Sequence, residues 1–310
     1  MKAATGDQYT ITSGSTSATV TQLAAALREF MADGVHLAET YPETALPPSG
    51  CGIVLAPWPN RVADGRWTLD GVEQQLDITE PARGNALHGL LRFTGYRLIE
   101  HTSDSVELGA TIFPQHGYPF RVETTVRYTV TEGALHVTHG ARNDSAARAP
   151  IAFGTHPFLT IGDADPDELV LTVHADTRFD VDDRLNPLAE VAVDGDYDLR
   201  QGRLVRELQL DTAFGGVHTI DGVSASLTAP DGRAVHLVQD SAHGYVQVYT
   251  TTTFPKRSGG AGLRDGEPGL AVAVEPMTAP PDALNSGEGL KWLEAGETWS
   301  VGWGIRYSGS

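Results

Sequence analysis

The strongest constraint on the fold of this chain is the alternation of side chains from Phe120 to Val130, where apolar positions are separated by charged or hydroxyl residues. Successive side chains of a β-strand point to opposite faces, so this period of two predicts a strand with one buried and one solvated face. Glu132-Gly133 then supplies turn chemistry, and Leu135 and Val137 continue the alternation. The segment is therefore predicted to be an antiparallel hairpin.

The same pattern recurs along the chain. A second hairpin is predicted from Val223 to Leu237, and a shorter one from Trp67 to Val72 with Asp70-Gly71 at its tip. Trp299 to Tyr307 alternates cleanly and predicts a C-terminal strand, while the apolar run Leu270 to Val274 predicts a buried one. The 34 glycines and 18 prolines agree with strands separated by turns.

One segment has a different period. Leu23, Leu27 and Phe30 recur at helical spacing, so the pattern between Thr21 and Met31 predicts a helix. Two stretches, Asp163 to Glu168 and Phe254 to Gly269, have the composition of long irregular loops. The chain contains no internal repeat and no Pro/Gly/Ser-rich linker, so residues 1–310 are predicted to form a single domain.

Composition restricts the partners that the chain can have. The 40 acidic residues outnumber the 22 basic ones and give a net charge of -18, which argues against binding to nucleic acid or an anionic membrane. A single cysteine, Cys51, rules out an internal disulfide and a thiolate metal cluster. Neither a signal peptide nor an apolar run of about 18 residues is recognised, so we expect a soluble, cytoplasmic protein.

His156 is the first candidate for chemistry. Pro157 disfavours helix at the residue before it, which places His156 in extended backbone or at a strand end. An imidazole titrates near neutral pH and is therefore a common general acid or base. The chain has 11 histidines, so an ordinary structural role remains the alternative for this one.

Glu275 is the second candidate, because it follows the apolar run that ends at Val274. A buried carboxylate without a partner costs several kcal/mol or stays protonated. We therefore expect Glu275 to be paired or to lie in a cleft.

Three further stretches place a polar side chain among apolar or turn-forming neighbours. Arg61 follows Asn60 and two prolines, His88 precedes a glycine, and Asp211 lies between apolar residues. The alternatives are a solvated loop arginine, a hydrogen-bonded structural histidine and the cap of a turn or helix. The local sequence leaves each of these choices open.

Several motif classes are absent from the sequence. There is no dinucleotide fingerprint, no phosphate-binding Gly-Lys-Ser/Thr loop, no His-Glu-x-x-His zinc motif and no Gly-x-Ser-x-Gly elbow. His136 and His139 are three apart in a predicted strand, which puts them on opposite faces and argues against a shared metal. We therefore predict neither a metal nor a cofactor.

Taken together, the motifs resemble those of the aldose 1-epimerases, the galactose mutarotase-like proteins. The resemblance spans about Ala56 to Tyr307, and a last hairpin after Leu293 also matches. The motifs that occur in the family's order are Asn60-Arg61, Asn85-Ala86-Leu87-His88-Gly89, Gly154-Thr155-His156-Pro157-Phe158, Leu210-Asp211, Gln247-Val248-Tyr249-Thr250 and Val274-Glu275-Pro276. This resemblance implies an all-β fold, a large and mostly antiparallel β-sandwich, with a sugar cleft across one sheet. It also implies that Thr21 to Met31 is strand rather than helix.

The resemblance assigns roles by position. His156 matches the family's general acid and Glu275 its general base. The residues that match contacts to the sugar are Asn60, Arg61, His88, Phe158, Asp211 and Gln247. Phe158 stands where many members have tyrosine, so one hydroxyl contact is expected to be missing.

The function implied is the interconversion of α and β anomers of a free hexose such as glucose or galactose, with no cofactor. Two alternatives stay open: a hexose-6-phosphate 1-epimerase, for which Arg83 and Arg92 would supply positive charge, and a non-catalytic sugar-binding protein. We expect a small aldose as the partner, a monomer or homodimer, and His156 and Glu275 in one cleft about a pyranose ring apart.

Overall fold

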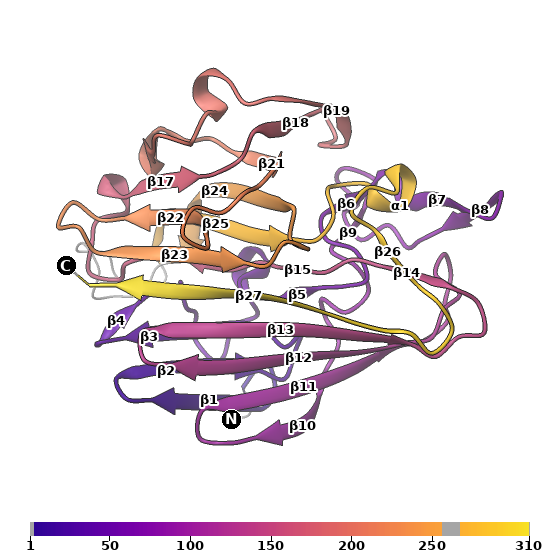
Figure 1. The fold of residues 1–310 in the computed structure, drawn as a ribbon, viewed down its shortest axis with the longest axis horizontal. Helices are drawn as coiled ribbons and strands as arrows, with labels where there is room; N and C mark the ends of the chain where they lie inside the picture. Colours follow the sequence, from indigo (N-terminus) through magenta and orange to yellow (C-terminus); the bar gives the residue numbers. More distant parts are fainter. Residues whose placement is uncertain (1–2, 256–266, 310) are drawn as a thin grey trace.

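The computed structural model describes residues 3–255 and 267–309, which form mostly antiparallel strands (Figure 1). Two large sheets lie face to face, and Figure 1 looks onto the larger one, with β24, β25 and β15 behind it. The larger sheet has nine strands in the order β10 (Arg97–His101), β11 (Ser105–Ile112), β12 (Val122–Thr131), β13 (Ala134–Asn143), β27 (Thr298–Ser308), β23 (Ala234–Gln239), β22 (Val223–Thr228), β17 (Val170–Val173) and β20 (Arg203–Leu204).

The second sheet has eight strands and contributes most of the site described below. Its order is β19 (Pro187–Ala192), β18 (Thr177–Val181), β21 (Asp211–Gly215), β24 (Tyr245–Pro255), β25 (Pro268–Met277), β15 (Gly154–Thr155) and β5 (Val54–Leu55), with β16 (Phe158–Leu159) also paired to β25. The large, mostly antiparallel β-sandwich predicted from the sequence is therefore confirmed.

Smaller sheets cover the ends of the sandwich. A four-stranded sheet is formed by β1 (Gln8–Ser13), β2 (Thr16–Thr21), β3 (Leu27–Ala32) and β4 (Val35–His36). The two-stranded sheets are β14 (Ala149–Ile151) with β26 (Lys291–Leu293), β6 (Arg61–Val62) with β9 (Ala86–Leu87), and β7 (Arg66–Leu69) with β8 (Val72–Gln75). Short 3-10 turns lie at Pro48–Gly50, Ala63–Gly65, Pro166–Glu168, Gly195–Tyr197 and Val205–Glu207, and the α-helix found in the described residues is α1 (Ala283–Ser286).

The core lies between the inner faces of the two large sheets. Val126, Tyr128 and Ile305 come from the nine-stranded sheet, and Val248 and Val274 from the eight-stranded one; all five are at most 1% exposed. Alternate residues of β12 and β13 are buried, as a period of two requires. The hydrophobic effect of burying these faces against each other is the main force that holds the sheets together.

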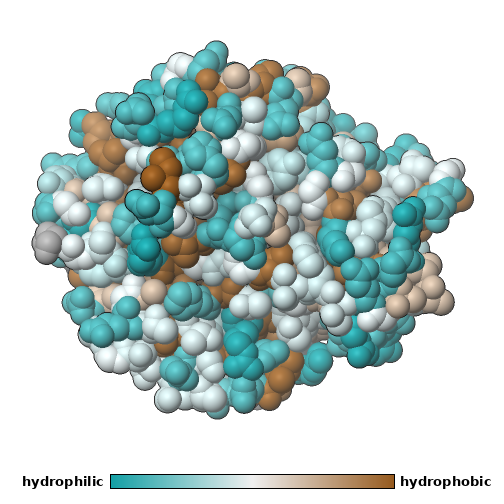
Figure 2. Space-filling model, in the orientation of Figure 1, coloured by the Kyte–Doolittle hydropathy of each residue, from teal (hydrophilic) through white to brown (hydrophobic). Residues whose placement is uncertain are grey.

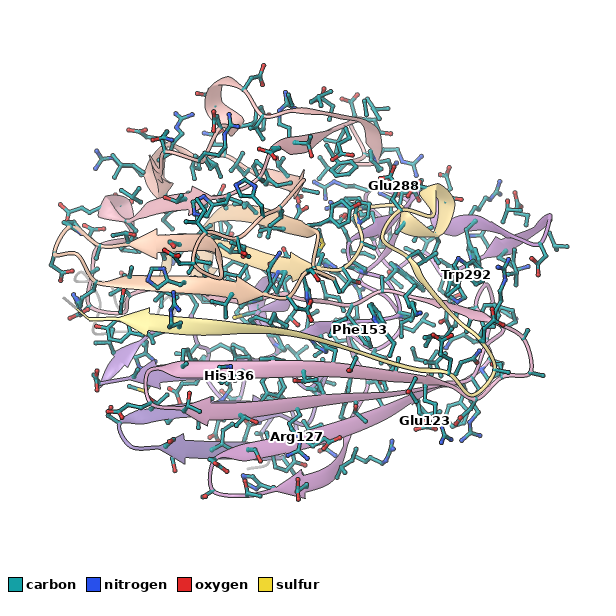
Figure 3. All side chains as sticks on the ribbon, in the orientation of Figure 1. Glu123, Arg127, His136, Phe153, Glu288 and Trp292 are labelled. Carbon is teal, nitrogen blue, oxygen red and sulfur yellow. The ribbon has the colours of Figure 1, made fainter. Side chains whose placement is uncertain are left out.

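The outer face of the nine-stranded sheet is polar. It is the face seen in Figure 2, where teal and white residues predominate and brown ones are scattered. Figure 3 labels Glu123, Arg127 and His136 on this sheet. His136 is exposed, whereas His139, on the same strand, is fully buried. The two imidazoles therefore lie on opposite faces, as predicted.

The hairpins predicted at Trp67–Val72, Phe120–Val137 and Val223–Leu237 are confirmed as β7–β8, β12–β13 and β22–β23. The loop predicted at Asp163–Glu168 contains one 3-10 turn at its end. Most of the second predicted loop, residues 256–266, lies outside the described residues. The hairpin expected after Leu293 is wrong, because β26 pairs with β14 whereas β27 pairs with β13 and β23.

The helix predicted between Thr21 and Met31 is also wrong. Ala24 and Ala25 have φ values of 56° and 45°, which break any right-handed helix, and β3 follows directly. The register between β2 and β3 shifts by one residue near Thr19, as in a β-bulge. This bulge brings Leu27 and Phe30 to the same buried face at a spacing of three, which imitates the helical period.

Gly89 is tightly packed against neighbouring backbone, beside the cleft described in the next section. Its φ is +71°, and a Cβ built on it would lie 2.1 Å from the carbonyl oxygen of Ala56. Gly71, at the tip of the β7–β8 hairpin, has a similar φ of +82° but nothing within 4 Å of such a Cβ.

We predict that Gly89→Ala is much more destabilising than Gly71→Ala. Both variants place a Cβ in the left-handed region, which costs about 1–2 kcal/mol, but only Gly89→Ala also collides with backbone. We expect its free energy of unfolding in urea to fall by at least about 2 kcal/mol more than that of the Gly71 variant. Equal losses in the two variants would contradict the packing described here.

Candidate active site

One cleft collects the charged and amide side chains that the sequence singled out. It has a volume of about 320 Å³ and opens beside β6, β9, β21, β24 and β25. The predicted residues that line it are Asn60, Arg61, His88, His156, Asp211, Gln247 and Glu275. These side chains come from segments up to 215 positions apart, from Asn60 to Glu275, and only the fold brings them together.

Strand register places the acidic and amide groups. In the β24–β25 pair Gln247 lies directly opposite Glu275, so both side chains point to the same face. In the β21–β24 pair Asp211 lies opposite Tyr249, two residues along from Gln247. Gln247 donates from Nε2 to Asp211 Oδ1 at 2.6 Å, which links side chains of β24 and β21 in the cleft.

His156 is held at a break between two short strands. β15 ends at Thr155 and β16 begins at Phe158, with Pro157 between them, as the sequence predicted. The His156 N–H donates to the Ile53 carbonyl, and the His156 carbonyl accepts from Gly52. The main chain around the imidazole is therefore hydrogen-bonded on both sides.

His156 and Glu275 are in direct contact. The imidazole Nε2 lies 3.3 Å from the carboxyl Oε1, and the two residues are 5% and 1% exposed. The expectation that they share one cleft is met, but the expected separation of a pyranose ring is wrong. Two buried polar groups gain by meeting each other, because neither is otherwise compensated for lost water.

Arg61 is the centre of a second group of charges. Its guanidinium donates through Nε to Glu80 at 2.9 Å and through Nη2 to both Glu80 and Asp211 at 3.2 Å. Glu80 also accepts from Arg83 at 3.0 Å. The side chain of Arg61 is only 8% exposed, so its charge is balanced within the protein rather than by water.

The backbone next to Arg61 is strained. Asn60 and His88 have φ values of 53° and 62°, in a region that residues other than glycine seldom adopt. Asn60 accepts the Arg61 N–H with its side-chain oxygen at 2.8 Å, and its carbonyl accepts the His88 N–H, also at 2.8 Å. Such strain is typical of functional sites whose surroundings hold them in place.

Four polar atoms at the cleft are buried with no hydrogen-bond partner in the part of the chain that the structure describes. They are Glu275 Oε2, Gln247 Oε1, His88 Nδ1 and His156 Nδ1. Buried polar atoms are almost always satisfied, so a group of exceptions in one cleft marks a place where a polar ligand can complete the bonding.

Phe158 is the one predicted contact that the structure does not bring to the cleft wall. It is fully buried, stacks on the His156 ring with centroids 5.3 Å apart, and packs against Phe254. Phe158 therefore belongs to the layer behind His156 and not to the wall of the cleft, and its predicted role as a sugar contact is corrected. Tyr249 instead lines the cleft, with its ring edge-on to His156 at 6.5 Å.

A family model described as Aldose 1-epimerase matches residues 7–306. This chain belongs to the aldose 1-epimerase family. It is 33% identical over 295 residues to the uncharacterised protein YihR of Escherichia coli K12, covering 94% of this chain and 90% of that one.

Two other aldose 1-epimerase relatives are more distant. Human galactose mutarotase is 33% identical over 160 residues, but the match covers only 48% of this chain and 45% of the human protein. The crystal structure of a GalM/aldose epimerase homologue from C. elegans has the same fold, with a TM-score of 0.83 over 97% of this chain and 98% of that one at 19% identity.

Sequence reasoning missed three residues that line this cleft, Glu80, Phe93 and Tyr249. Arg83 and Arg92, which the sequence suggested only for a sugar phosphate, line it too. Tyr249 could have been found, because it belongs to the motif that contains Gln247. Glu80 had no local signal, since its importance comes from the distant Arg61.

Residues 3–255 and 267–309 contain neither a metal-ligand cluster nor a membrane-spanning helix. In these ranges no group of three or more His, Cys, Asp or Glu side chains is arranged to hold a metal ion. None of their helices has the length and apolar character needed to cross a membrane.

Burial shifts the pKa values of His156 and Glu275 in opposite directions. It raises the pKa of Glu275 well above its ordinary value, the negative charge of Asp211 adds to this, and Arg61 opposes it. Burial lowers the pKa of His156 to about 4. Both shifts favour the uncharged forms, a carboxylic acid beside a neutral imidazole.

Glu275→Gln is expected to stabilise this protein, and increasingly so as the pH rises. The unfolded chain releases the Glu275 proton above its ordinary pKa, about 4.5, whereas the folded protein keeps it up to its raised pKa. The wild type therefore loses up to about 1.4 kcal/mol per pH unit through this group in that window. Glutamine has no proton to lose, so the difference in melting temperature should grow from pH 5 to pH 8. A difference independent of pH would contradict the raised pKa.

Proposed function

We propose that this protein is an aldose 1-epimerase that interconverts the α and β anomers of a free hexose such as glucose or galactose. The observation that carries the proposal is the buried His156–Glu275 pair, 3.3 Å apart at the floor of a polar cleft. Membership of the aldose 1-epimerase family supports a carbohydrate epimerase, and the human relative is named galactose mutarotase.

The reaction needs two proton transfers at oxygens attached to the same carbon. In the proposed mechanism the Glu275 carboxylate takes the proton of the C1 hydroxyl while the His156 imidazolium protonates the ring oxygen. The C1–O5 bond breaks, and an open-chain aldehyde forms. Rotation about the C1–C2 bond followed by the reverse transfers closes the ring on the other face. Each positioned acid or base contributes about 10²–10⁴-fold to such a step.

The proton count of the pair agrees with this scheme. Before ring opening the reactive form is imidazolium with carboxylate; afterwards it is imidazole with carboxylic acid. Both forms carry one proton, as does the uncharged pair that burial favours. The contact between His156 and Glu275 therefore keeps the right number of protons available for either direction.

The rest of the cleft suits an uncharged polyol. Asp211, Gln247 and Asn60 offer hydrogen-bond acceptors and donors around the buried pair. His88 contributes a neutral imidazole, because burial first, and then its neighbours His156, Arg61 and Arg92, lower its pKa well below the ordinary value. Hydrogen bonds to neutral hydroxyls do not require the cleft to carry net charge.

Arg83 and Arg92 favour a second candidate, an epimerase of a sugar phosphate such as a hexose 6-phosphate, because both line the cleft. Of the two, Arg83 is already paired with Glu80, whereas Arg92 donates to the Thr79 carbonyl. The buried cation, Arg61, is saturated by Glu80 and Asp211. The free sugar is therefore our first choice, and rates on glucose and glucose 6-phosphate separate the two.

We predict that the wild-type protein accelerates mutarotation of freshly dissolved α-glucose or α-galactose, followed by polarimetry. His156→Ala and Glu275→Gln should each lower kcat by about 10²–10⁴-fold, since each removes one proton transfer. If both variants catalyse mutarotation at the wild-type rate, the roles assigned to His156 and Glu275 are wrong. Sugar binding by calorimetry without any acceleration in the wild type would establish the binding-protein alternative instead.

Glu80→Gln should raise KM with a much smaller effect on kcat. The variant leaves the proton-transfer pair intact but removes the charge that holds Arg61 in place on one side. We expect KM to rise about tenfold, as loss of one charge-assisted hydrogen bond allows. Glu73→Gln, an exposed glutamate outside the cleft lining, is the control and should behave as wild type. A fall in kcat at constant KM would argue against this role for Glu80.

A further inference from the structure

The cleft has an aromatic rim that the chemistry above does not use. Phe93 lines the cleft although its side chain is 63% exposed, unlike the 5% and 1% of His156 and Glu275. The gradient in exposure places Phe93 at the mouth and the acid–base pair at the floor. An exposed aromatic ring at the edge of a polar cleft offers a face on which a ligand can pack.

Arg92 fixes one side of this rim. Its guanidinium lies over the Phe93 ring, 4.9 Å from the centroid, and donates to the Thr79 carbonyl at 3.0 Å. It has no ion pair within the two described ranges. The rim therefore combines a held aromatic face with free N–H donors, which are the two kinds of contact that a sugar ring can use.

The depth of the acid–base pair sets the orientation of the reacting sugar. C1 and the ring oxygen must reach His156 and Glu275 at the floor, so this edge of the pyranose enters first. The atoms across the ring from them are C4 and C3, which then face the mouth. The exocyclic C6 is attached to C5, beside the ring oxygen, and so lies nearer the floor than C4 does.

We propose that Arg92 and Phe93 form a second sugar subsite, which binds the non-reducing ring of a disaccharide linked through O4 of the reacting aldose. This inference rests on the proposed function for the orientation of the first ring. The weakly positive C–H edges of a pyranose pack on the face of Phe93, and Arg92 donates to its hydroxyls. A second ring or a phosphate attached at O6 is bonded to the reacting sugar nearer the floor of the cleft. It therefore does not reach Arg92 and Phe93 in the same way.

Phe113 provides a matched control for the Phe93 variant, because it is an exposed aromatic residue outside the cleft. Phe113 is 60% exposed and also lies under an arginine, with Arg121 5.5 Å from its ring centroid. It does not line the cleft. Phe113→Ala therefore removes the same side chain in the same kind of setting without touching the proposed subsite.

The test measures mutarotation of single anomers of glucose, of the 4-linked disaccharides maltose and lactose, and of the 6-linked disaccharide melibiose. Phe93→Ala should lower kcat/KM for the 4-linked sugars about two- to tenfold, the size of one aromatic contact. Its kcat/KM for glucose and melibiose should remain within about twofold of wild type. Phe113→Ala should leave all four sugars unchanged.

Other outcomes overturn the proposal. Equal losses on glucose and maltose in Phe93→Ala would make the residue a contact of the first ring or a structural one. The same losses in Phe113→Ala would show a general effect of surface truncation. If Phe93→Ala is silent while Arg92→Gln lowers activity on glucose 6-phosphate alone, the rim is an anion site.

Calorimetric titration separates failure of this subsite from failure of the proposed function. If no sugar is epimerised, the proposed function falls. In that case the subsite is supported only if the wild type still binds maltose more tightly than glucose and Phe93→Ala removes the difference. If the wild type binds the two sugars equally well, the subsite is refuted.

Discussion

The site depends on a contact between an acid and a base that are both removed from water. A lone buried carboxylate or imidazolium costs several kcal/mol, but His156 and Glu275 meet at 3.3 Å. The contact exists because β25 carries Glu275 on the floor of the cleft while the break between β15 and β16 presents His156 to it. Moving either strand would leave a buried ionisable group without a partner.

The other charged residues of the cleft are likewise stabilised by partners of opposite charge or by hydrogen bonds within the protein. Arg61 is buried between Glu80 and Asp211, and Gln247 ties Asp211 to the strand that faces Glu275. On the other side of the cleft, the strained backbone at Asn60 and His88 determines the conformation of the loops. Strain of this kind costs about 1–3 kcal/mol at each residue and persists only where surrounding packing enforces it. The β-sandwich is the stable frame that holds the cleft in this less favourable geometry.

Local patterns were reliable for hairpins whose residues alternate on both sides of a turn that contains glycine. The β12–β13 and β22–β23 hairpins were predictable for this reason, although β22–β23 has one register shift, between Val223 and Ala225. The helical period at Leu27 and Phe30 misled because a bulge shifts the register of β3, and a bulge is a property of two strands rather than one. Phe158 was placed in the right motif but on the wrong side of His156, since an aromatic next to a site can line it or support it.

By itself, the sequence determined that this chain is a β-protein and singled out His156 and Glu275 as candidates for chemistry, because period-two patterning, a proline after a histidine and a carboxylate after an apolar run are all local features. Only the tertiary structure decided that the two are in contact, that Glu80 balances Arg61, and that Phe93 stands at the mouth. Those facts depend on strands far apart in the chain, and the free energy of a buried charge depends on every group packed around it.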